Sequence, residues 1–299
     1  MRKKFLLIVL LIMLLTACTN AGASSSANEN TPTEPQTQAQ NDVPGDPQET
    51  VNVAPLEPFR PLTRSVTFAA SDGTELQGTF YPPENDNAPL VILMHWARGD
   101  QSDYAVIADW LQNRGGEPDN TANAAETWLD ASWFPRIEQG TSYGVFTFSF
   151  RDCSAGCAAF HSAEWLDDAQ SAVAYAHDLD YIDPNRIIVA GASIGADGAV
   201  DGCLYLNQAF PGSCKGAFSI SPGSYLTQTY ADVVDQLGAP AVCLYAPSDG
   251  SAVTACANVN AQNYTGYEIG NAHGMDLIDP QVQPNPLDLL LAFIGENSQ

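Results

Sequence analysis

Residues 186–190, Arg-Ile-Ile-Val-Ala, run directly into residues 191–195, Gly-Ala-Ser-Ile-Gly, and this junction decides the fold. The first stretch follows a turn at residues 183–185 and is rich in β-branched side chains, which predicts a strand buried on both faces. Residues 196–206 are small and apolar and favour a helix packed closely against a sheet. A serine flanked by glycines at such a junction predicts a sharp strand-to-helix turn, because a side chain at either flank would collide with backbone.

Segments with strand and helix character alternate along the rest of the chain. Two alternating runs around Ser71-Asp72-Gly73 predict an N-terminal hairpin. The further expected strands are 89–96, 143–150, 216–221, 241–247 and 267–270. The further expected helices are 102–113, a short one within 128–137, 163–179 and 286–294. This alternation predicts an α/β fold: a mainly parallel central sheet with helices on both faces and an N-terminal antiparallel hairpin.

Two residues that can assist a serine lie at the ends of later predicted strands. Asp249 follows residues 241–247, and His273 follows residues 267–270 as the only histidine C-terminal to Ser193. The carboxyl ends of parallel strands meet at one edge of a sheet, so the three side chains should converge there. The chain order serine, acid, histidine is typical of a serine hydrolase on an α/β sheet. We interpret Ser193 as nucleophile, His273 as general base and Asp249 as the group that orients the imidazole.

Four other aspartates are alternatives for the acid. None of them matches the strand-end position as well as Asp249 does. They are Asp232, Asp235, Asp276 and Asp279.

Residues 64–299 resemble the α/β-hydrolase superfamily, particularly the dienelactone-hydrolase-like and prolyl-oligopeptidase-related esterases. The matching stretches are residues 71–76, 89–95, 183–195, 245–249 and 271–274. Dienelactone hydrolases carry cysteine at the sharp turn, whereas this chain carries Ser193. The resemblance therefore implies hydrolysis of carboxylic esters through an acyl-serine intermediate.

The expected oxyanion donors are backbone N–H groups of Ile194 and of the 96–97 turn, where we name Trp96 ahead of Ala97. Two departures from the family pattern lie nearby. His95-Trp96 stands where the family usually has His-Gly, and Ser149-Phe150-Arg151-Asp152 keeps only the arginine of Asp-x-Arg-Gly.

A peptidase or amidase and an acyltransferase of the same fold are alternatives, because the same acyl-enzyme chemistry serves all three. A non-catalytic surface lipoprotein on a hydrolase scaffold is a further alternative, since a fold does not guarantee an activity. As an esterase the protein is expected to act on a small-molecule ester. It is expected to need no metal, nucleotide or other cofactor.

The N-terminus predicts export. A basic start at residues 2–4 precedes eleven apolar residues, 5–15, and Leu15-Thr16-Ala17-Cys18 resembles the bacterial lipoprotein cleavage box. We expect a signal peptide over residues 1–17, a lipidated Cys18 that holds the protein to a membrane of the bacterial cell envelope, outside the cytoplasm, and a disordered tether over residues 18–60. Residues 61–299 then form the α/β-hydrolase domain.

Six cysteines remain besides Cys18, an even number that suits an oxidising compartment. We predict pairing between sequence neighbours: Cys153 with Cys157, Cys203 with Cys214, and Cys243 with Cys256. No second close pair supports a zinc site, so we expect no metal. The net charge of −24 at pH 7 argues against nucleic acid as a partner.

Overall fold

The computed structural model describes residues 60–114, 133–279 and 281–299. The chain divides into two units, Met1–Leu56 and Glu57–Gln299, and all described residues belong to the second. The predicted signal peptide, Cys18 and nearly all of the predicted tether lie outside the described residues. Among the described helices, none combines the length and apolarity needed to cross a membrane.

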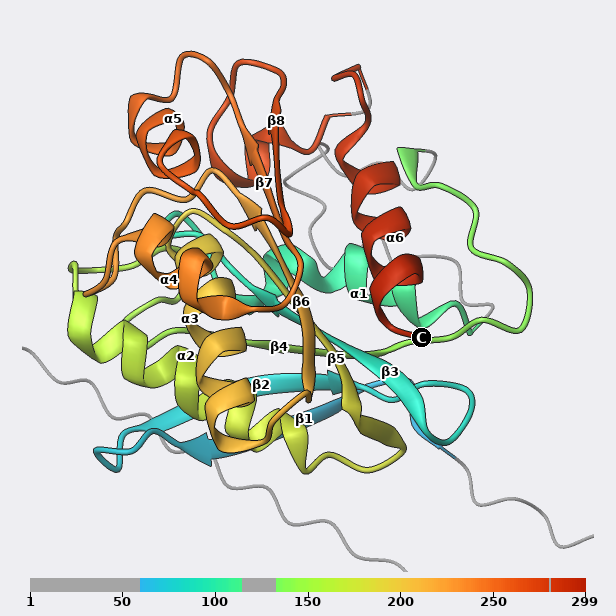
Figure 1. Ribbon diagram of the computed structural model, residues 1–299. Helices are drawn as coiled ribbons and strands as arrows, with labels where there is room; N and C mark the ends of the chain where they lie inside the picture. Colours follow the sequence, from blue (N-terminus) through green and yellow to red (C-terminus); the bar gives the residue numbers. More distant parts are fainter. Residues whose placement is uncertain (1–59, 115–132, 280) are drawn as a thin grey trace, which may run out of the picture. The chain divides into compact units, whose positions relative to one another are not determined.

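Within the described residues, eight strands form one sheet (Figure 1). They are β1 (Arg64–Ala69), β2 (Glu75–Tyr81), β3 (Ala88–Met94), β4 (Gly144–Phe148), β5 (Ile182–Ala192), β6 (Cys214–Ile220), β7 (Ala241–Tyr245) and β8 (Tyr264–Glu268). Their order is β1-β2-β4-β3-β5-β6-β7-β8. Strand β2 runs antiparallel to β1 and β4, and β4, β3 and β5 to β8 are parallel to one another. The predicted fold class, including the antiparallel hairpin, is confirmed.

Helices cover both faces of the sheet, as Figure 1 shows. They are α1 (Ala105–Gln112), α2 (Ser162–His177), α3 (Ile194–Ala209), α4 (Tyr230–Leu237), α5 (Gly250–Ala257) and α6 (Pro286–Asn297), with short 3₁₀ helices at Gln101–Tyr104 (η1) and Gly274–Leu277 (η3). One apolar core lies under α2, α3, α4 and α5, and a second lies under α1, η3 and α6. The central strands β3 and β5 contribute to both cores, which is why β3 and the second half of β5, residues 187–192, carry apolar side chains or glycine throughout.

Several details differ from the sequence-based expectations, besides shifts of one or two residues at the ends of strands. Helix α5 was not predicted. Strand β8 spans Tyr264–Glu268 instead of 267–270. The predicted short helix begins in residues that are not described, and residues 135–138 are not helical.

All three predicted disulfides are present: Cys153–Cys157, Cys203–Cys214 and Cys243–Cys256. The second joins α3 to β6, and the third joins β7 to α5. The first closes a loop of five residues after β4.

Candidate active site

Ser193 occupies the turn between β5 and α3, with a single residue separating strand from helix. Its φ and ψ are 54° and −117°, a backbone conformation that residues with a Cβ rarely adopt. A Cβ at Gly191 would lie 2.1 Å from the carbonyl oxygen of Gly195, and one at Gly195 would lie 2.1 Å from that of Met94. Both flanking positions therefore require glycine. The Ser193 N–H donates to the carbonyl of Ile220 (2.8 Å), which fixes the turn against β6.

His273 follows β8 and reaches the serine. Its Nε2 lies 2.9 Å from the Ser193 Oγ, although 80 positions separate the two residues. The histidine side chain is 32% exposed, whereas Ser193 is 6% exposed. The serine is therefore buried, while the imidazole that contacts its hydroxyl is partly exposed to solvent.

Asp249 follows β7 and caps the N-terminus of α5. One carboxylate oxygen lies 2.5 Å from the His273 Nδ1, and the other accepts from the Ser251 hydroxyl (2.9 Å) and the Ala252 N–H (3.3 Å). Burial opposes ionisation of Asp249, but the hydrogen bonds from His273, Ser251 and Ala252 outweigh it and hold its pKa below the usual value. An ionised carboxylate only accepts, so Nδ1 carries the imidazole proton and Nε2 is free to accept one from Ser193.

The four alternative aspartates make contacts elsewhere. Asp232 accepts from the Thr229 hydroxyl, Asp235 from Asn260, and Asp279 from the Gln281 N–H. Asp276 lies 3.6 Å from the Arg98 guanidinium. Of the five candidates, Asp249 is the one hydrogen-bonded to His273 in the described part of the chain.

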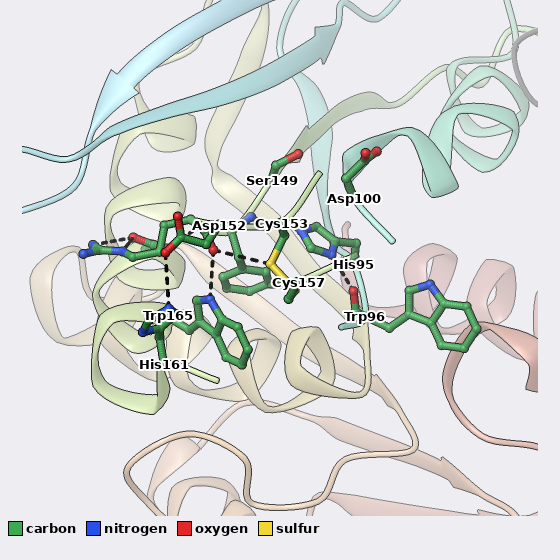
Figure 2. Close-up of a disulfide and its surroundings, with 12 residues drawn as sticks. His95, Trp96, Asp100, Ser149, Asp152, Cys153, Cys157, His161 and Trp165 are labelled. Carbon is green, nitrogen blue, oxygen red and sulfur yellow. Dashed lines mark hydrogen bonds and ion pairs between the residues drawn. A yellow bond between two sulfur atoms is a disulfide. The ribbon is translucent and has the colours of Figure 1, made fainter. Parts of the chain in front are cut away.

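His95 lies fully buried at the end of β3 and organises the turn that follows it. Its Nε2 accepts from the Phe150 N–H (3.0 Å), so its Nδ1 carries the proton and donates to the Trp96 carbonyl (2.7 Å; Figure 2). Burial lowers the pKa of His95 to about 4, and the ring is therefore neutral near pH 7. The Trp96 carbonyl also accepts from the Gly99 N–H (3.3 Å).

The bulky Trp96 is accommodated because its ring points away from His95, as Figure 2 shows. The indole N–H donates to Asp103 (2.8 Å). On its other side the ring covers Gly274, where a Cβ would lie 2.7 Å from a ring carbon. Trp96 thus packs against the residue that follows His273, and its side chain supports the histidine loop.

Tyr225 stands beside the same three side chains and was not singled out from the sequence. Its hydroxyl lies 3.2 Å from the Ser251 Oγ, and its ring meets the His273 ring edge-on at 6.4 Å. Burial raises the pKa of Tyr225, and interactions with the side chains of Ser251 and Ser193 oppose the rise. Its loop carries no motif, so only the folded arrangement reveals it.

Among the described residues, no group of three or more His, Cys, Asp or Glu side chains could hold a metal ion.

Comparison with curated proteins finds relatives without an assigned activity. No family model matches the chain. The uncharacterized protein YfhR of Escherichia coli (strain K12) is 30% identical over 140 residues, 46% of this chain and 40% of that protein. YfhR of Salmonella typhi is 26% identical over 231 residues, 76% of this chain and 62% of that protein. The chain thus matches less than two thirds of the length of these relatives.

Several solved structures share the fold of this chain. The thermophilic carboxylesterase EstE1 from a metagenomic library superposes with a TM-score of 0.53 at 17% identity, over 79% of this chain and 89% of that one. The Pyrococcus furiosus esterase Pf2001 superposes with a TM-score of 0.55 at 14% identity, over 79% of this chain and 93% of that one. The 2,6-dihydroxy-pseudo-oxynicotine hydrolase superposes with a TM-score of 0.55 at 13% identity, over 79% of this chain and 68% of that one. This chain has the α/β-hydrolase fold. At these identities the likeness concerns the fold alone.

Proposed function

We propose that this protein is a serine hydrolase that cleaves carboxylic esters through an acyl-Ser193 intermediate. The observation that carries the proposal is the continuous hydrogen-bonded series from the Ser193 hydroxyl through His273 to Asp249. The same geometry would serve an amidase or an acyltransferase. We favour an ester substrate because the structural neighbours named above include two esterases.

In the proposed mechanism His273 accepts the hydroxyl proton at Nε2 as Ser193 attacks the ester carbonyl. The imidazolium then donates this proton to the departing alcohol, which leaves an acyl-enzyme. Water attacks the acyl group with His273 again as base, and the imidazolium then returns the proton to the Ser193 oxygen as the acid departs. Asp249 stabilises the imidazolium in both halves and keeps the proton on Nδ1.

The developing oxyanion needs two N–H donors. Ile194 opens helix α3, and the first N–H groups of a helix have no acceptor within it. For the second donor we favour Ala97 over Trp96. A trans peptide points its C=O and N–H in opposite directions, so the hydrogen bond from His95 to the Trp96 carbonyl turns the Ala97 N–H away from His95.

Tyr225 is proposed as a substrate-contacting residue. Its hydroxyl is near Ser251 and Ser193, where the alcohol portion or the carbonyl of an ester would lie. A phenol hydroxyl can donate to either oxygen of the substrate.

Ser193→Ala tests the proposal in the full chain. We expect turnover of a short-chain aryl ester to fall by about 10³-fold or more, with circular dichroism unchanged. A fluorophosphonate should label wild type at Ser193 and leave the variant unlabelled. Wild-type turnover in the variant would exclude the mechanism, and comparison of matched ester and amide substrates separates esterase from amidase.

The proposed location is the bacterial cell envelope, with the protein anchored through acylated Cys18. The support is the sequence around residues 15–18 together with the three disulfides, which suit an oxidising compartment. Labelling with an alkyne fatty acid should mark wild type and Ser193→Ala equally, and Cys18→Ala should remain unlabelled. Labelled Cys18→Ala would exclude this anchor.

A further inference from the structure

The turn formed by His95–Gly99 lies against a second loop, which follows β4. We call residues 153–157, closed by the Cys153–Cys157 bridge, the disulfide loop. The Cys157 N–H donates to the Ala97 carbonyl (2.9 Å), and the Ala155 N–H donates to the Asp100 carboxylate (2.8 Å). A Cβ on Gly156 would lie only 3.4 Å from the Arg98 carbonyl oxygen, so the backbones are in close contact.

The segment that leads into the disulfide loop holds the same turn from its other end. The Phe150 N–H donates to His95, and the Gln101 N–H donates to the Ser149 hydroxyl (3.3 Å). Figure 2 shows His95, Asp100 and Ser149 beside the disulfide. Four hydrogen bonds therefore join the segment 149–157 to the segment 95–101.

Helix α2 anchors the segment 149–157 in turn. Arg151 makes two hydrogen bonds to the fully buried Asp168, from Nε (2.9 Å) and from a terminal nitrogen (2.6 Å). The Trp165 indole N–H donates to the Arg151 carbonyl (3.2 Å; Figure 2). The arginine that the family pattern retains thus fixes the start of the segment, and the disulfide closes its end.

The disulfide loop and the residue before it hold an unusual backbone conformation. Ala155 and Gly156 within it have φ values of 54° and 120°, and Asp152 directly before it has a φ of 58°. A left-handed conformation is unfavourable for residues other than glycine, here Asp152 and Ala155, so this short segment benefits from a constraint. A cross-link supplies it by removing alternative conformations of the open chain.

Taking these contacts together, and relying on the proposed function, we propose that the disulfide loop and Asp100 position the oxyanion donor of the His95–Gly99 turn. The Ala97 peptide is clamped on one side by His95 through the Trp96 carbonyl and on the other by Cys157 through the Ala97 carbonyl. These are positioning residues, because they act on the transition state through the turn. Small displacements of such a donor reduce the rate of the chemical step more than substrate binding.

The test removes the cross-link in the full chain with Cys153→Ser/Cys157→Ser. We expect kcat for an aryl ester to fall by roughly tenfold to a hundredfold with KM nearly unchanged. We also expect the rate ratio between the ester and its thionoester to fall. Sulfur is a poor hydrogen-bond acceptor, so this ratio reports on the oxyanion donors, and a merely structural loss would leave it unchanged.

The matched control is Cys203→Ser/Cys214→Ser, which removes a disulfide at the opposite end of β6 from Ser193. Its ester-to-thionoester ratio should equal that of wild type. Asp100→Ala gives a second, independent route: it leaves the disulfide intact, removes the acceptor for Ala155 and should lower the same ratio. Asp100→Asn retains an acceptor oxygen and should restore most of the ratio.

The outcomes separate the two proposals. If wild type neither hydrolyses esters nor reacts with a fluorophosphonate at Ser193, the proposed function fails and this inference fails with it. If wild type is active and both Cys153→Ser/Cys157→Ser and Asp100→Ala keep its kcat and its ratio, the positioning role alone is overturned. A Cys153→Ser/Cys157→Ser protein that does not fold leaves the decision to Asp100→Ala.

Discussion

The Nδ1 atom of His273 and the Oδ2 atom of Asp249 lie 2.5 Å apart, and the aspartate that makes this contact is also the N-cap of α5. Its second oxygen is held by Ser251 and Ala252 in the first turn of that helix. The helix terminus thus fixes the carboxylate, and the carboxylate fixes the imidazole. The geometry of the proposed triad depends on a local capping interaction.

Asp249→Asn should therefore impair catalysis without unfolding the protein. An amide can present its NH₂ group to Nδ1 and favour the wrong imidazole tautomer. We expect kcat to fall by about 10²–10⁴-fold with little change in KM. Steady-state kinetics on an aryl ester gives both values. Asp232→Asn is the control, because Asp232 lies in the first turn of α4 and its carboxylate accepts from the N-cap hydroxyl of Thr229. An equal loss in both variants would contradict the assignment.

The strained backbone at Ser193 predicts a difference in stability between two inactive variants. Glycine adopts positive φ without steric cost, whereas alanine keeps the strain that serine bears. Ser193→Gly should exceed Ser193→Ala in free energy of unfolding by about 1 kcal/mol. Urea denaturation at one pH measures both. If Ser193→Ala were the more stable of the two, the turn would not be strained as described.

The fold and the convergence of Ser193, Asp249 and His273 could be predicted because their signals are local. The apolar run 187–190 predicts a buried strand, and the glycines around Ser193 predict a sharp turn after it. Asp249 and His273 follow predicted parallel strands, so they are expected at the same edge of the sheet. The catalytic role of the three residues stays a prediction, but the structure brings their side chains together as expected.

Other features lacked such signals. Residues 250–257 are mostly small, with glycine first, and give no amphipathic pattern, so α5 was missed. Strand β8 is an edge strand whose residues are partly or fully exposed, and its apolar pattern is correspondingly weak. Tyr225 and the contacts of the disulfide loop depend on segments far apart in the chain, which no local pattern encodes.

Tyr225→Phe tests the proposed contact with the substrate while keeping the ring that packs beside His273. Loss of one hydrogen bond of about 0.5–1.5 kcal/mol should lower kcat/KM about twofold to tenfold. The control is Tyr264→Phe, whose hydroxyl donates to the Cys256 carbonyl. It should change the melting temperature and leave kcat/KM intact. Unchanged kinetics in Tyr225→Phe would remove this residue from the site.

Asp201 on α3 predicts how stability depends on pH. It is 3% exposed, and neither carboxylate oxygen has a hydrogen-bond partner among the described residues. Burial, and then the nearby charge of Asp197, raise its pKa from 3.8 to about 7. The folded state therefore binds this proton more tightly than the unfolded state. The contribution of the protonated Asp201 carboxyl to the free energy of unfolding is therefore fully present below about pH 4, and it is lost as the pH rises through about 7.

Asp201→Asn replaces the carboxyl group with a neutral group of nearly the same shape and removes this loss. At pH 8 the variant should be more stable than wild type by about 2–4 kcal/mol, since one pKa unit corresponds to about 1.4 kcal/mol. At pH 4 the two proteins should differ little. Urea denaturation between pH 4 and pH 8 measures the difference, and Asp180→Asn, at an exposed side chain, serves as control. If the stabilities of Asp201→Asn and wild type ran parallel across this range, Asp201 would not carry the buried proton that its surroundings favour.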